Sequence, residues 1–370
     1  MENIAVIFGG KSVEHDISII TALQVMKAFP KGYNMIPLYV RIDGIMVNGE
    51  NLSDEKLYLN YAKNVKNERK VFFRVGSPFV YFQGKGKIKE TIKIDGAVLC
   101  NHGNGGEDGS LQGLLELCNI PYTSPGVASS AVCMDKVLTK TVLLENDLPT
   151  PLCLYFKRCE YEQMNNEIKQ KIASELSFPC IVKPARCGSS VGISICEYPE
   201  KLDECIKGAL LYDDKVIVEE FIENAREFFC AVVSVDGTLL TSKIDEASKD
   251  KFYTFEEKYL EQKKRKEVKV DKALTDKVKQ MAKCAYKCLE CAGVVRVDFL
   301  MSKDGQLYVN EVNTIPGSLA FNLFESKFSD LLHSLIINAQ KRNDRRIVYR
   351  FNSQAIERYI EMGKSGKLQK

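Results

Sequence analysis

In the first third of the chain, short apolar runs alternate with segments in which apolar residues recur at helical spacing. The run Ile4–Phe8 is typical of a buried strand, and it leads through two glycines into a helical pattern that ends near Phe29. Ile36–Val40 and Gly96–Cys100 are further strand-like runs, and a helical pattern over Leu111–Cys118 follows a glycine-rich loop. This alternation predicts parallel strands covered by helices.

The pattern divides the chain into three units and a tail. Residues 1–124 are predicted to form a Rossmann-like domain with a parallel sheet. Its irregular, charged stretch from Arg41 to Lys93 is expected to add a hairpin excursion at one edge. Residues 125–216 form the second predicted unit, with a helix over Ser129–Glu145 and a buried strand at Cys180–Lys183.

The third predicted unit begins at the strand Val216–Glu219 and covers residues 217–345. Residues 346–370 form a basic tail, in which a short helix is predicted over Ser353–Met362. The prediction is therefore an α/β protein with three α/β domains.

Composition restricts the classes of function. The chain has 370 residues, enough for two or three domains with cores, and its 52 Lys+Arg and 49 Asp+Glu give a net charge of +3. A charge so close to zero predicts no nucleic-acid or membrane partner. Ile4–Phe8 is too short for a signal peptide, and no apolar run has the length of a membrane span. The 13 cysteines are scattered without a framework spacing, which favours reduced thiols and a cytoplasmic location.

Two short strands near the C-terminus carry hard oxygen ligands. Asp298, Glu311 and Asn313 offer two carboxylates and an amide oxygen, a set that suits magnesium shared with nucleotide phosphates. Arg296 precedes the first carboxylate, and a Pro-Gly turn ending at Gly317 follows the last ligand. Cationic and backbone donors beside a metal are typical of phosphoryl- or acyl-transfer sites. The alternative is two surface strands with ordinary charges.

Two other segments have the character of nucleotide sites. Lys183–Gly192 follows a strand and supplies glycines, hydroxyls and a lysine for phosphate oxygens, although a generic surface loop can look similar. Gly9–Ser12 resembles part of a Walker A loop, but Ala5 stands where that motif needs glycine, which excludes it. Glu219 and Glu227 can bind an adenine amino group and ribose hydroxyls, but strand-end glutamates are common.

Cysteines, basic residues and histidines leave alternatives open. Cys284, Cys288 and Cys291 have a spacing seen in iron–sulfur enzymes, but the same spacing forms one helix face, so we predict core packing. Lys263–Lys266 is expected to be a solvated loop rim, with an anion contact as the alternative. His333, inside an apolar helical stretch, is predicted to be packed.

His15 and His102 lie in loops that leave the carboxyl ends of predicted parallel strands, where ligands bind in open α/β sheets. These two loops therefore belong to the predicted site.

Taken in order, six motifs resemble the D-alanine–D-alanine ligases of the ATP-grasp superfamily. They are Gly9–Ser18, His102–Gln112, Met134–Lys136, Ile181–Gly192, Phe255–Tyr259 and Arg296–Gly317. They span about residues 3 to 325 in the family's order and spacing. The resemblance implies the ATP-grasp fold, with ATP held between the second and third domains.

The resemblance also implies roles for individual residues. It assigns the nucleotide to Lys136, Lys183, Glu219, Glu220, Ile222, Glu227 and Lys258. It assigns two magnesium ions, or manganese in their place, to Asp298, Glu311 and Asn313. It assigns the substrates to Glu14, His102, Lys258, Arg296, Asn322 and Leu323, and catalysis to Glu14, Ser189, Tyr259, Arg296 and Gly317.

The implied reaction joins two D-alanines with ATP for peptidoglycan precursors and releases ADP and phosphate. Glu14 would bind the ammonium of the first substrate, linked by hydrogen bonds to Ser189 and Tyr259. ATP converts the donor carboxylate into an acyl phosphate, the second amine attacks it, and Arg296 with the Gly317 amide stabilises the oxyanion. Small-molecule substrates and a homodimer are the expected partners.

The sequence departs from the family pattern in two places. Cys187 stands where a phosphate-loop glutamate is usual, and Asn322, in the altered segment Ser318–Leu323, replaces the serine that contacts the acceptor carboxylate. The acceptor is therefore left open between D-alanine and another amino acid such as D-serine. A catalytically altered homologue is a further alternative. Lys258 and Tyr259, on a loop expected to close over the site, argue against a hydroxy-acid acceptor.

Overall fold

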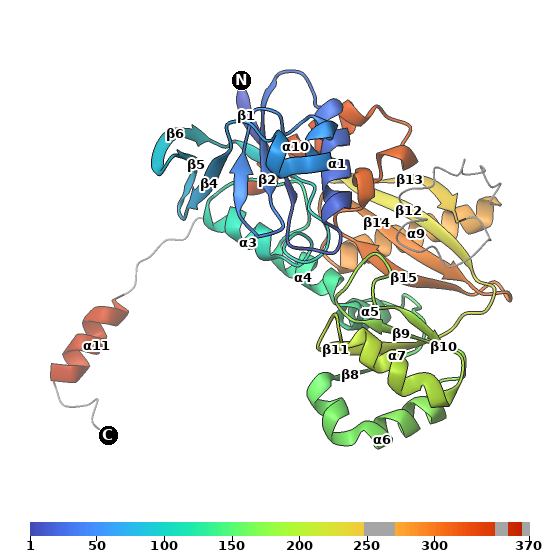
Figure 1. Ribbon diagram of the computed structural model, residues 1–370. Coiled ribbons are helices and arrows are strands. Elements are labelled where there is room, and N and C mark those ends of the chain that lie inside the picture. The colour runs from blue at the N-terminus through green and yellow to red at the C-terminus, as the bar shows by residue number, and fades with distance from the viewer. Residues whose placement is uncertain (248–270, 345–353, 365–370) are drawn as a thin grey trace.

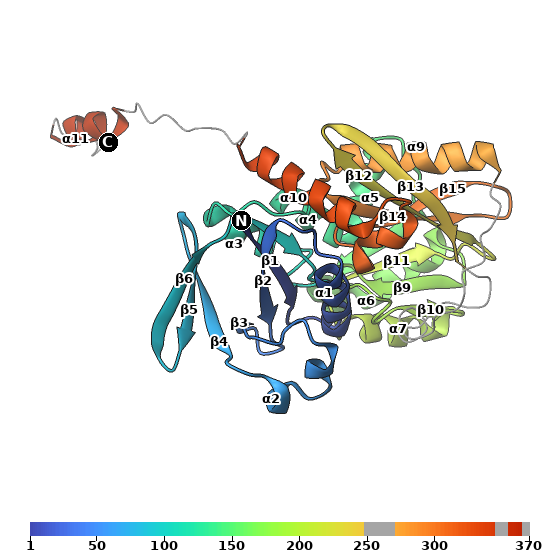
Figure 2. The same ribbon diagram turned by 90° about the horizontal axis from the view of Figure 1, so that it is seen from above.

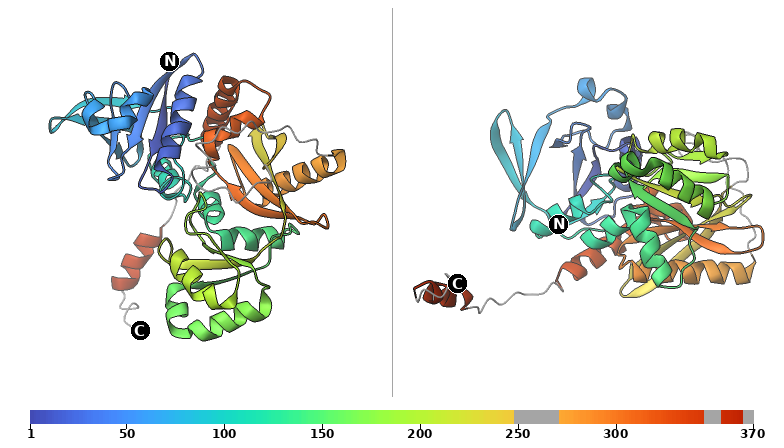
Figure 3. Two further views of the ribbon diagram at one scale, coloured as in Figure 1. Left: turned by 45° about the vertical axis from the view of Figure 1, so that its right-hand side comes forward. Right: turned by 90° about the horizontal axis from the view of Figure 1, so that it is seen from below.

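The protein contains three β-sheets that form three lobes in the computed structural model (Figure 1; Figure 3, left). The structure describes residues 1–247, 271–344 and 354–364. The basic run Lys263–Lys266 lies outside these residues. The sheets follow one another along the chain. Their buried residues form separate hydrophobic cores, one of which joins the first sheet to the third.

The first sheet has seven strands in the order β6-β5-β4-β3-β2-β1-β7. The central strand β1 (Glu2–Gly9) runs parallel to both β2 (Tyr33–Val40) and β7 (Gly96–Leu99). The helices α1 (His15–Lys27) and α3 (Ser110–Leu117) follow β1 and β7 in the chain, as the sequence predicted. Because these strands are parallel, their carboxyl ends and the loops that leave them meet at one edge of the sheet.

The stretch after β2 extends this sheet at its edge, which confirms the predicted excursion. It adds antiparallel strands, so the sheet is mixed. The added elements are β3 (Met46–Asn48), η1 (Glu55–Asn60), α2 (Tyr61–Asn64), β4 (Arg69–Arg74), β5 (Ser77–Gly84) and β6 (Lys87–Lys93).

The second sheet has four antiparallel strands in the order β10-β9-β11-β8. Its strands are β8 (Cys153–Lys157), β9 (Cys180–Pro184), β10 (Ser194–Cys196) and β11 (Lys215–Glu220). Its helices are α6 (Arg158–Glu175), η2 (Pro199–Lys201) and α7 (Leu202–Ala209). The hydrogen bonds of β11 place it in this sheet, although the sequence began the third unit with this strand.

The single helix predicted over Ser129–Glu145 is wrong, because the chain forms two helices there. These are α4 (Val127–Met134) and α5 (Lys136–Glu145), separated by Asp135 in an extended conformation. The Asp135 carboxylate accepts hydrogen bonds from the Val137 and Leu138 amides, which satisfies amide groups of the first turn of α5. A buried carboxylate at this position therefore ends one helix and begins the next.

The third sheet has four antiparallel strands in the order β13-β12-β14-β15. They are β12 (Arg226–Val235), β13 (Thr238–Glu246), β14 (Val294–Met301) and β15 (Leu307–Asn313). The remaining elements are α9 (Lys272–Cys288), η3 (Gly317–Leu323), α10 (Phe328–Asp344) and α11 (Ala355–Lys364). The last of these confirms the predicted tail helix within two residues at each end.

One face of the third sheet shares a hydrophobic core with the first lobe. Helix α10 packs against both β7 and β12, and it lies between the two sheets when the molecule is seen from above (Figure 2). Leu319 and Leu323 of η3 enter the same core as the strands of the first sheet. The segment that follows β15 is therefore held by the N-terminal lobe.

The cysteine prediction is confirmed and the histidine prediction is not. Cys284, Cys288 and Cys291 pack against the core of the third sheet, and burial raises the pKa of Cys288 to about 11. His333 is exposed rather than packed, because it lies on the outer face of α10, where its Nδ1 is 2.9 Å from the Tyr33 hydroxyl. Among the helices that the structure describes, none has an apolar stretch sufficient to cross a lipid bilayer.

Candidate active site

Asp298, Glu311, Asn313 and Arg296 lie on one face of the third sheet. Asp298 pairs with Glu311 across β14 and β15, and Arg296 pairs with Asn313 two positions along. Side chains two residues apart on a strand share a face, which brings the four groups together. Arg296 donates two hydrogen bonds to the Asp298 carboxylate, at 2.6 and 2.7 Å, and Asn313 Nδ2 donates a third at 3.1 Å.

Lys136 links these strands to the loop after β9. Its Nζ lies 3.1 Å from Glu311 Oε1 and donates a hydrogen bond of 2.7 Å to the Cys187 carbonyl. Burial by itself lowers the pKa of Lys136, but the charge and hydrogen bond of Glu311, with the charges of Cys187 and Glu219, together outweigh burial, and the pKa lies above its ordinary value. This buried cation therefore lies between the carboxylates of the third sheet and the loop after β9, which the sequence predicted to bind phosphates.

A second buried cluster contains two lysines and one glutamate. Lys183 Nζ lies 2.8 Å from Glu219 Oε2, and Lys140 Nζ lies 3.3 Å from Glu219 Oε1. Burial lowers the pKa of Lys140, and the charge of Lys183 lowers it further, while Glu219 opposes both. The cluster carries one more positive than negative charge at a buried place, which suits an anionic ligand. The sequence reasoning missed Lys140, whose only signal is that it lies one helical turn after Lys136.

The other predicted nucleotide residues lie at the end of β11 and the start of β12. Glu220 Oε1 accepts a hydrogen bond of 2.7 Å from the Leu152 amide. Ile222 lies in the turn between the two strands, and Glu227 pairs with Leu300 in the third sheet. Both are half-buried. Lys258 and Tyr259 lie outside the described residues.

Glu14 joins the first lobe to the second. It is buried at the start of α1, and Ser189 Oγ donates a short hydrogen bond to its Oε1. A Cβ atom at Gly188 would lie 2.5 Å from Glu14 Oε2, and one at Gly103 would lie 2.7 Å from it, so both backbones approach the carboxylate closely. A cavity of about 370 Å³ opens beside Glu14 and is lined also by Lys11, Asn104, Cys187 and Tyr212.

Glu107 is a functional candidate that the sequence reasoning missed, although it lies inside a motif that the sequence singled out. Its carboxylate accepts hydrogen bonds from the Gly103 amide at 3.0 Å, the Ile315 amide at 2.8 Å and the Thr314 hydroxyl at 3.3 Å. Burial and then the negative charge of Glu14 raise the pKa of Glu107 to about 7. Two neighbouring carboxylates, one buried and one half-buried, favour a cationic ligand near them.

The remaining predicted substrate residues divide between the interior and the surface. His102 is buried, and burial lowers its pKa to about 4, so its imidazole is neutral at neutral pH. Gly317 is the first residue of η3, Leu323 is buried, and the side chain of Asn322 is exposed. Within the segment in which the sequence departs from the family pattern, the Asn322 side chain is therefore exposed at the protein surface.

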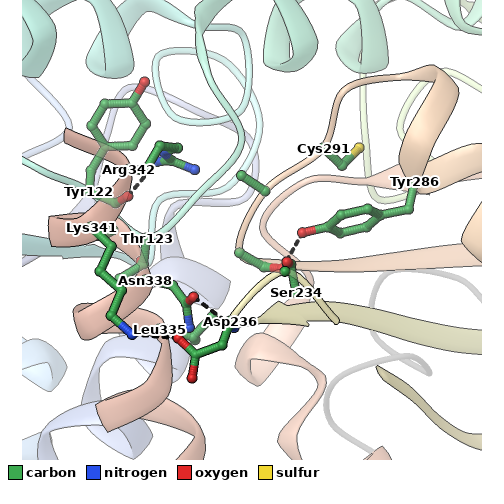
Figure 4. Close-up of a pocket in the computed structure, with 14 residues that line it drawn as sticks. Tyr122, Thr123, Ser234, Asp236, Tyr286, Cys291, Leu335, Asn338, Lys341 and Arg342 are labelled. Carbon is green, nitrogen blue, oxygen red and sulfur yellow. Dashed lines mark hydrogen bonds and ion pairs between the residues drawn. The ribbon is translucent and has the colours of Figure 1, made fainter. Parts of the chain in front are cut away.

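A larger cavity, of about 420 Å³, lies away from these groups (Figure 4). It is lined by the end of the first sheet, the β12–β13 turn and α10, and its charged groups are paired within the protein. Lys341 Nζ lies 2.5 Å from Asp236 Oδ1, and Arg342 donates to the Tyr122 carbonyl at 2.7 Å. None of the predicted site residues lines it, so the smaller cavity beside Glu14 is the candidate substrate site.

Comparison with known proteins decides the family. Residues 3–125 match the family model described as the D-ala D-ala ligase N-terminus, and residues 142–336 match that of the D-ala D-ala ligase C-terminus. The chain belongs to the D-alanine–D-alanine ligase family. A D-alanine–D-alanine ligase of Thermosipho melanesiensis is 37% identical over 361 residues, which cover 94% of this chain and 96% of the relative.

Two solved structures of related ligases match most of the chain. That of the D-alanine-D-alanine ligase from Coxiella burnetii has a TM-score of 0.79 at 27% identity, covering 98% of this chain and 99% of that one. That of the VanG D-Ala:D-Ser ligase from Enterococcus faecalis has a TM-score of 0.77 at 29% identity, covering 91% and 99%. The three sheets therefore form the ATP-grasp fold, and the family uses ATP and a divalent metal.

The oxygen donors on β14 and β15 suit the metal that the family uses. Two carboxylates and one amide oxygen are hard ligands, and they leave coordination positions for water and phosphate oxygens. In the part of the chain that the structure describes, no group of three or more His, Cys, Asp or Glu side chains is arranged to hold a metal ion. Two carboxylates with an amide oxygen instead fit Mg²⁺ that shares its coordination with a nucleotide.

Proposed function

We propose that this protein is an ATP-dependent ligase that joins two D-alanine molecules and releases ADP and phosphate. The position of Lys136 carries the proposal, because its Nζ contacts both Glu311 and the carbonyl of Cys187. Lys136 thus connects the carboxylates suited to a metal, Asp298 and Glu311, with the loop suited to phosphates. This is the arrangement that phosphoryl transfer from a nucleotide requires.

In this proposal the nucleotide lies between the second and third sheets. Lys136 and Lys183 hold phosphates, and Lys140 adds positive charge behind Lys183. The end of β11 and the start of β12 hold the adenine and ribose through Glu219, Glu220, Ile222 and Glu227. Glu219 is paired with two lysines in the described structure, so the nucleotide competes with these ion pairs. Lys258 and Tyr259 lie outside the described residues, and their role on a loop that closes over the site stays a prediction.

We propose Asp298, Glu311 and Asn313 as ligands of two Mg²⁺ ions, for which Mn²⁺ is the alternative. When bound, the ions neutralise charge on the transferring phosphoryl group. Arg296 is oriented by its two hydrogen bonds to Asp298, so it is rigid enough to act as a donor to the reacting centre.

The chemistry proceeds in two steps. A carboxylate oxygen of the first D-alanine attacks the γ-phosphorus, the bond to the bridging oxygen of ADP breaks, and an acyl phosphate forms. The amine of the second D-alanine then attacks the acyl carbon and loses a proton, and phosphate leaves. Glu14, positioned by Ser189, binds the ammonium of the first D-alanine. Arg296 and the Gly317 amide stabilise the oxyanion of the second step.

D-Alanine is also the proposed acceptor, with Asn322 and Leu323 beside its carboxylate. The curated relative from Thermosipho melanesiensis carries the name of a D-alanine–D-alanine ligase, which favours D-alanine over D-serine. We place the protein in the cytoplasm, as a homodimer that supplies the dipeptide for peptidoglycan precursors. The domain boundaries at residues 124, 216 and 345 stay predictions.

An acceptor panel tests the proposal. The protein is incubated with ATP, Mg²⁺ and D-alanine alone, and then with D-alanine together with D-serine or D-lactate. ADP release and product masses are measured together. We expect D-alanyl-D-alanine in one-to-one ratio with ADP, and this dipeptide should remain the main product in each mixture. A main product that contains D-serine would show that D-serine is the preferred acceptor. Release of ADP without any dipeptide would contradict ligase activity.

A further inference from the structure

The segment after β15 has an unusual backbone. Ser318, Leu319 and Ala320 all have left-handed conformations, with φ values of 55°, 49° and 49°. Residues other than glycine adopt this conformation as single positions, seldom as three in a row, because Cβ crowds the following carbonyl. The surrounding structure must therefore hold this left-handed turn (Ser318–Ala320) in place.

The N-terminal lobe stabilises this turn. Leu319 and Ala320 are 4% and 3% exposed, and they lie in the core of the first sheet, with η3 packed against α1. The Ser318 amide donates a hydrogen bond of 3.0 Å to the hydroxyl of Thr21, a fully buried residue of α1. One side chain of the first lobe thus contacts the backbone of the turn directly.

Thr21 also connects the turn to His102. Thr21 Oγ1 lies 2.8 Å from Nε2 of His102, and it accepts a hydrogen bond from the Ser318 amide. His102 is buried, and its ring also makes a hydrogen bond to the Ile315 backbone.

These contacts fix the segment that leads into the turn. His102 contacts Thr21 and the Ile315 backbone, and Glu107 accepts hydrogen bonds from the Ile315 amide and the Thr314 hydroxyl. The loop between the metal ligand Asn313 and the turn is thus held by three side chains of the first lobe. Each of them is buried or half-buried, which excludes water from competing for these bonds.

We propose that Thr21 is a positioning residue that sets the acceptor side of the active site, acting through Ser318 and together with His102. The inference rests on the proposed function, because the turn lies between Gly317, the proposed oxyanion donor, and Asn322, the proposed acceptor contact. Thr21 touches neither substrate in this account. It fixes the backbone on which the acceptor carboxylate and the second-step oxyanion depend.

The test is the variant Thr21→Val, which keeps the shape of the side chain and removes the hydroxyl. Initial rates over a wide range of D-alanine concentration give separate donor and acceptor constants. We expect the acceptor KM to rise by about tenfold, the effect of losing one buried hydrogen bond. The donor KM and the ATP KM should each change by less than about twofold, because neither depends on this hydrogen bond. Thr21→Ser, which keeps a hydroxyl, should have an acceptor KM close to that of the wild type.

Ser18→Ala is the matched control. Ser18 is a fully buried hydroxyl one helical turn earlier on α1, and it bonds to Gly9 and Cys100 rather than to the turn. Its loss should not raise the acceptor KM preferentially. Hydrogen exchange gives a readout that needs no activity, because the Ser318 amide should exchange faster in Thr21→Val than in the wild type or in Ser18→Ala.

The outcomes separate the two proposals. A wild-type protein that forms no dipeptide contradicts the proposed function, while faster Ser318 exchange in Thr21→Val would still support the hold on the turn. If the wild type is active, equal shifts of donor and acceptor KM, or unchanged Ser318 exchange, would overturn the role of Thr21. Thr21→Cys, whose thiol is a weak hydrogen-bond partner, provides the same comparison if Thr21→Val fails to fold.

Discussion

Glu311 is the single residue on which the charge of the site depends most. It faces Asp298 across β14 and β15 and pairs with Lys136, so it is shared between the proposed metal ligands and the proposed phosphate site. Replacing Glu311 with Gln keeps the size of the side chain and removes its charge. We expect turnover to fall by roughly 100- to 1000-fold, measured as dipeptide formed at saturating ATP.

Glu325→Gln is the control for this loss of charge. Glu325 is an exposed carboxylate that pairs with Lys243 at 3.0 Å, so the variant loses a lysine ion pair without touching the site. Its turnover should equal that of the wild type. Near wild-type turnover in Glu311→Gln would show that the metal ligands are assigned wrongly.

Glu107 predicts a pH dependence of stability. Its pKa in the folded protein, about 7, lies above the ordinary value of 4.5, because burial and the charge of Glu14 disfavour the carboxylate. A raised pKa means that the folded state binds the proton more tightly. The resulting stability is complete below about pH 4.5 and is lost as pH rises through about 7.

The comparison of wild type with Glu107→Gln isolates this contribution, since the other titrating groups are common to both. The free energy of unfolding of the wild type, minus that of Glu107→Gln, should fall between pH 5 and pH 8 in urea titrations. A difference that stays constant or rises over this range would mean that Glu107 is already ionised at pH 5.

Residues such as Glu107, Lys140 and Thr21 show the limit of sequence reasoning at this scale. The sequence predicted Asp298 and Glu311 because their types and spacing on two adjacent strands are informative without knowledge of the fold. Lys140 is one of many lysines on helices, and only tertiary packing brings it to Glu219. Thr21 acts on a segment almost three hundred positions away, which no local pattern can indicate.

At the scale of elements, the turn of η3 stores strain. A left-handed conformation costs about 1–2 kcal/mol for a residue with a Cβ atom, and glycine avoids this cost. Ser318→Gly should therefore be more stable than Ser318→Ala by about 1 kcal/mol. In a right-handed helix the order would be reversed. Urea unfolding of both variants measures the difference, and a more stable alanine variant would contradict the left-handed turn.

Helix α9 allows a second test at this scale. Its cysteines Cys284 and Cys288, with Cys291 just after it, pack on the third sheet. Replacing all three with alanine should lower the free energy of unfolding by roughly one to a few kcal/mol through lost burial. The folded fraction should keep its turnover. Stoichiometric iron in protein purified without oxygen would instead favour the iron–sulfur alternative.

The elements that the sequence predicted well are those with strong local patterns. Strands β1 and β2 and helix α1 are apolar runs or clear helical repeats, so burial and local preference agree. The predicted helix over Ser129–Glu145 failed because one carboxylate, Asp135, caps a new helix within an unbroken apolar pattern. The sequence began the third unit at strand β11 and did not indicate that this strand joins the second sheet, because its antiparallel pairing with β8 and β9 depends on contacts distant in sequence.

At the scale of the whole molecule, one face of the third sheet shares a core with the first lobe, while its other face packs against α9 in a separate core and the second lobe has a core of its own. Helix α10 and the η3 segment join the first sheet to the third. We therefore expect the first and third lobes to lose structure in a single transition, followed by hydrogen exchange at increasing urea. Separate transitions for these two lobes would mean that the shared core contributes little.

We propose that ATP activates the carboxylate of the first D-alanine as an acyl phosphate in a site built across these lobes. The most direct measurement uses D-alanine labelled with ¹⁸O in both carboxylate oxygens, with mass spectrometry of the released phosphate. We expect one ¹⁸O atom in the phosphate released for each dipeptide formed, because the donor oxygen leaves with the phosphoryl group. Dipeptide formation with unlabelled phosphate would contradict it.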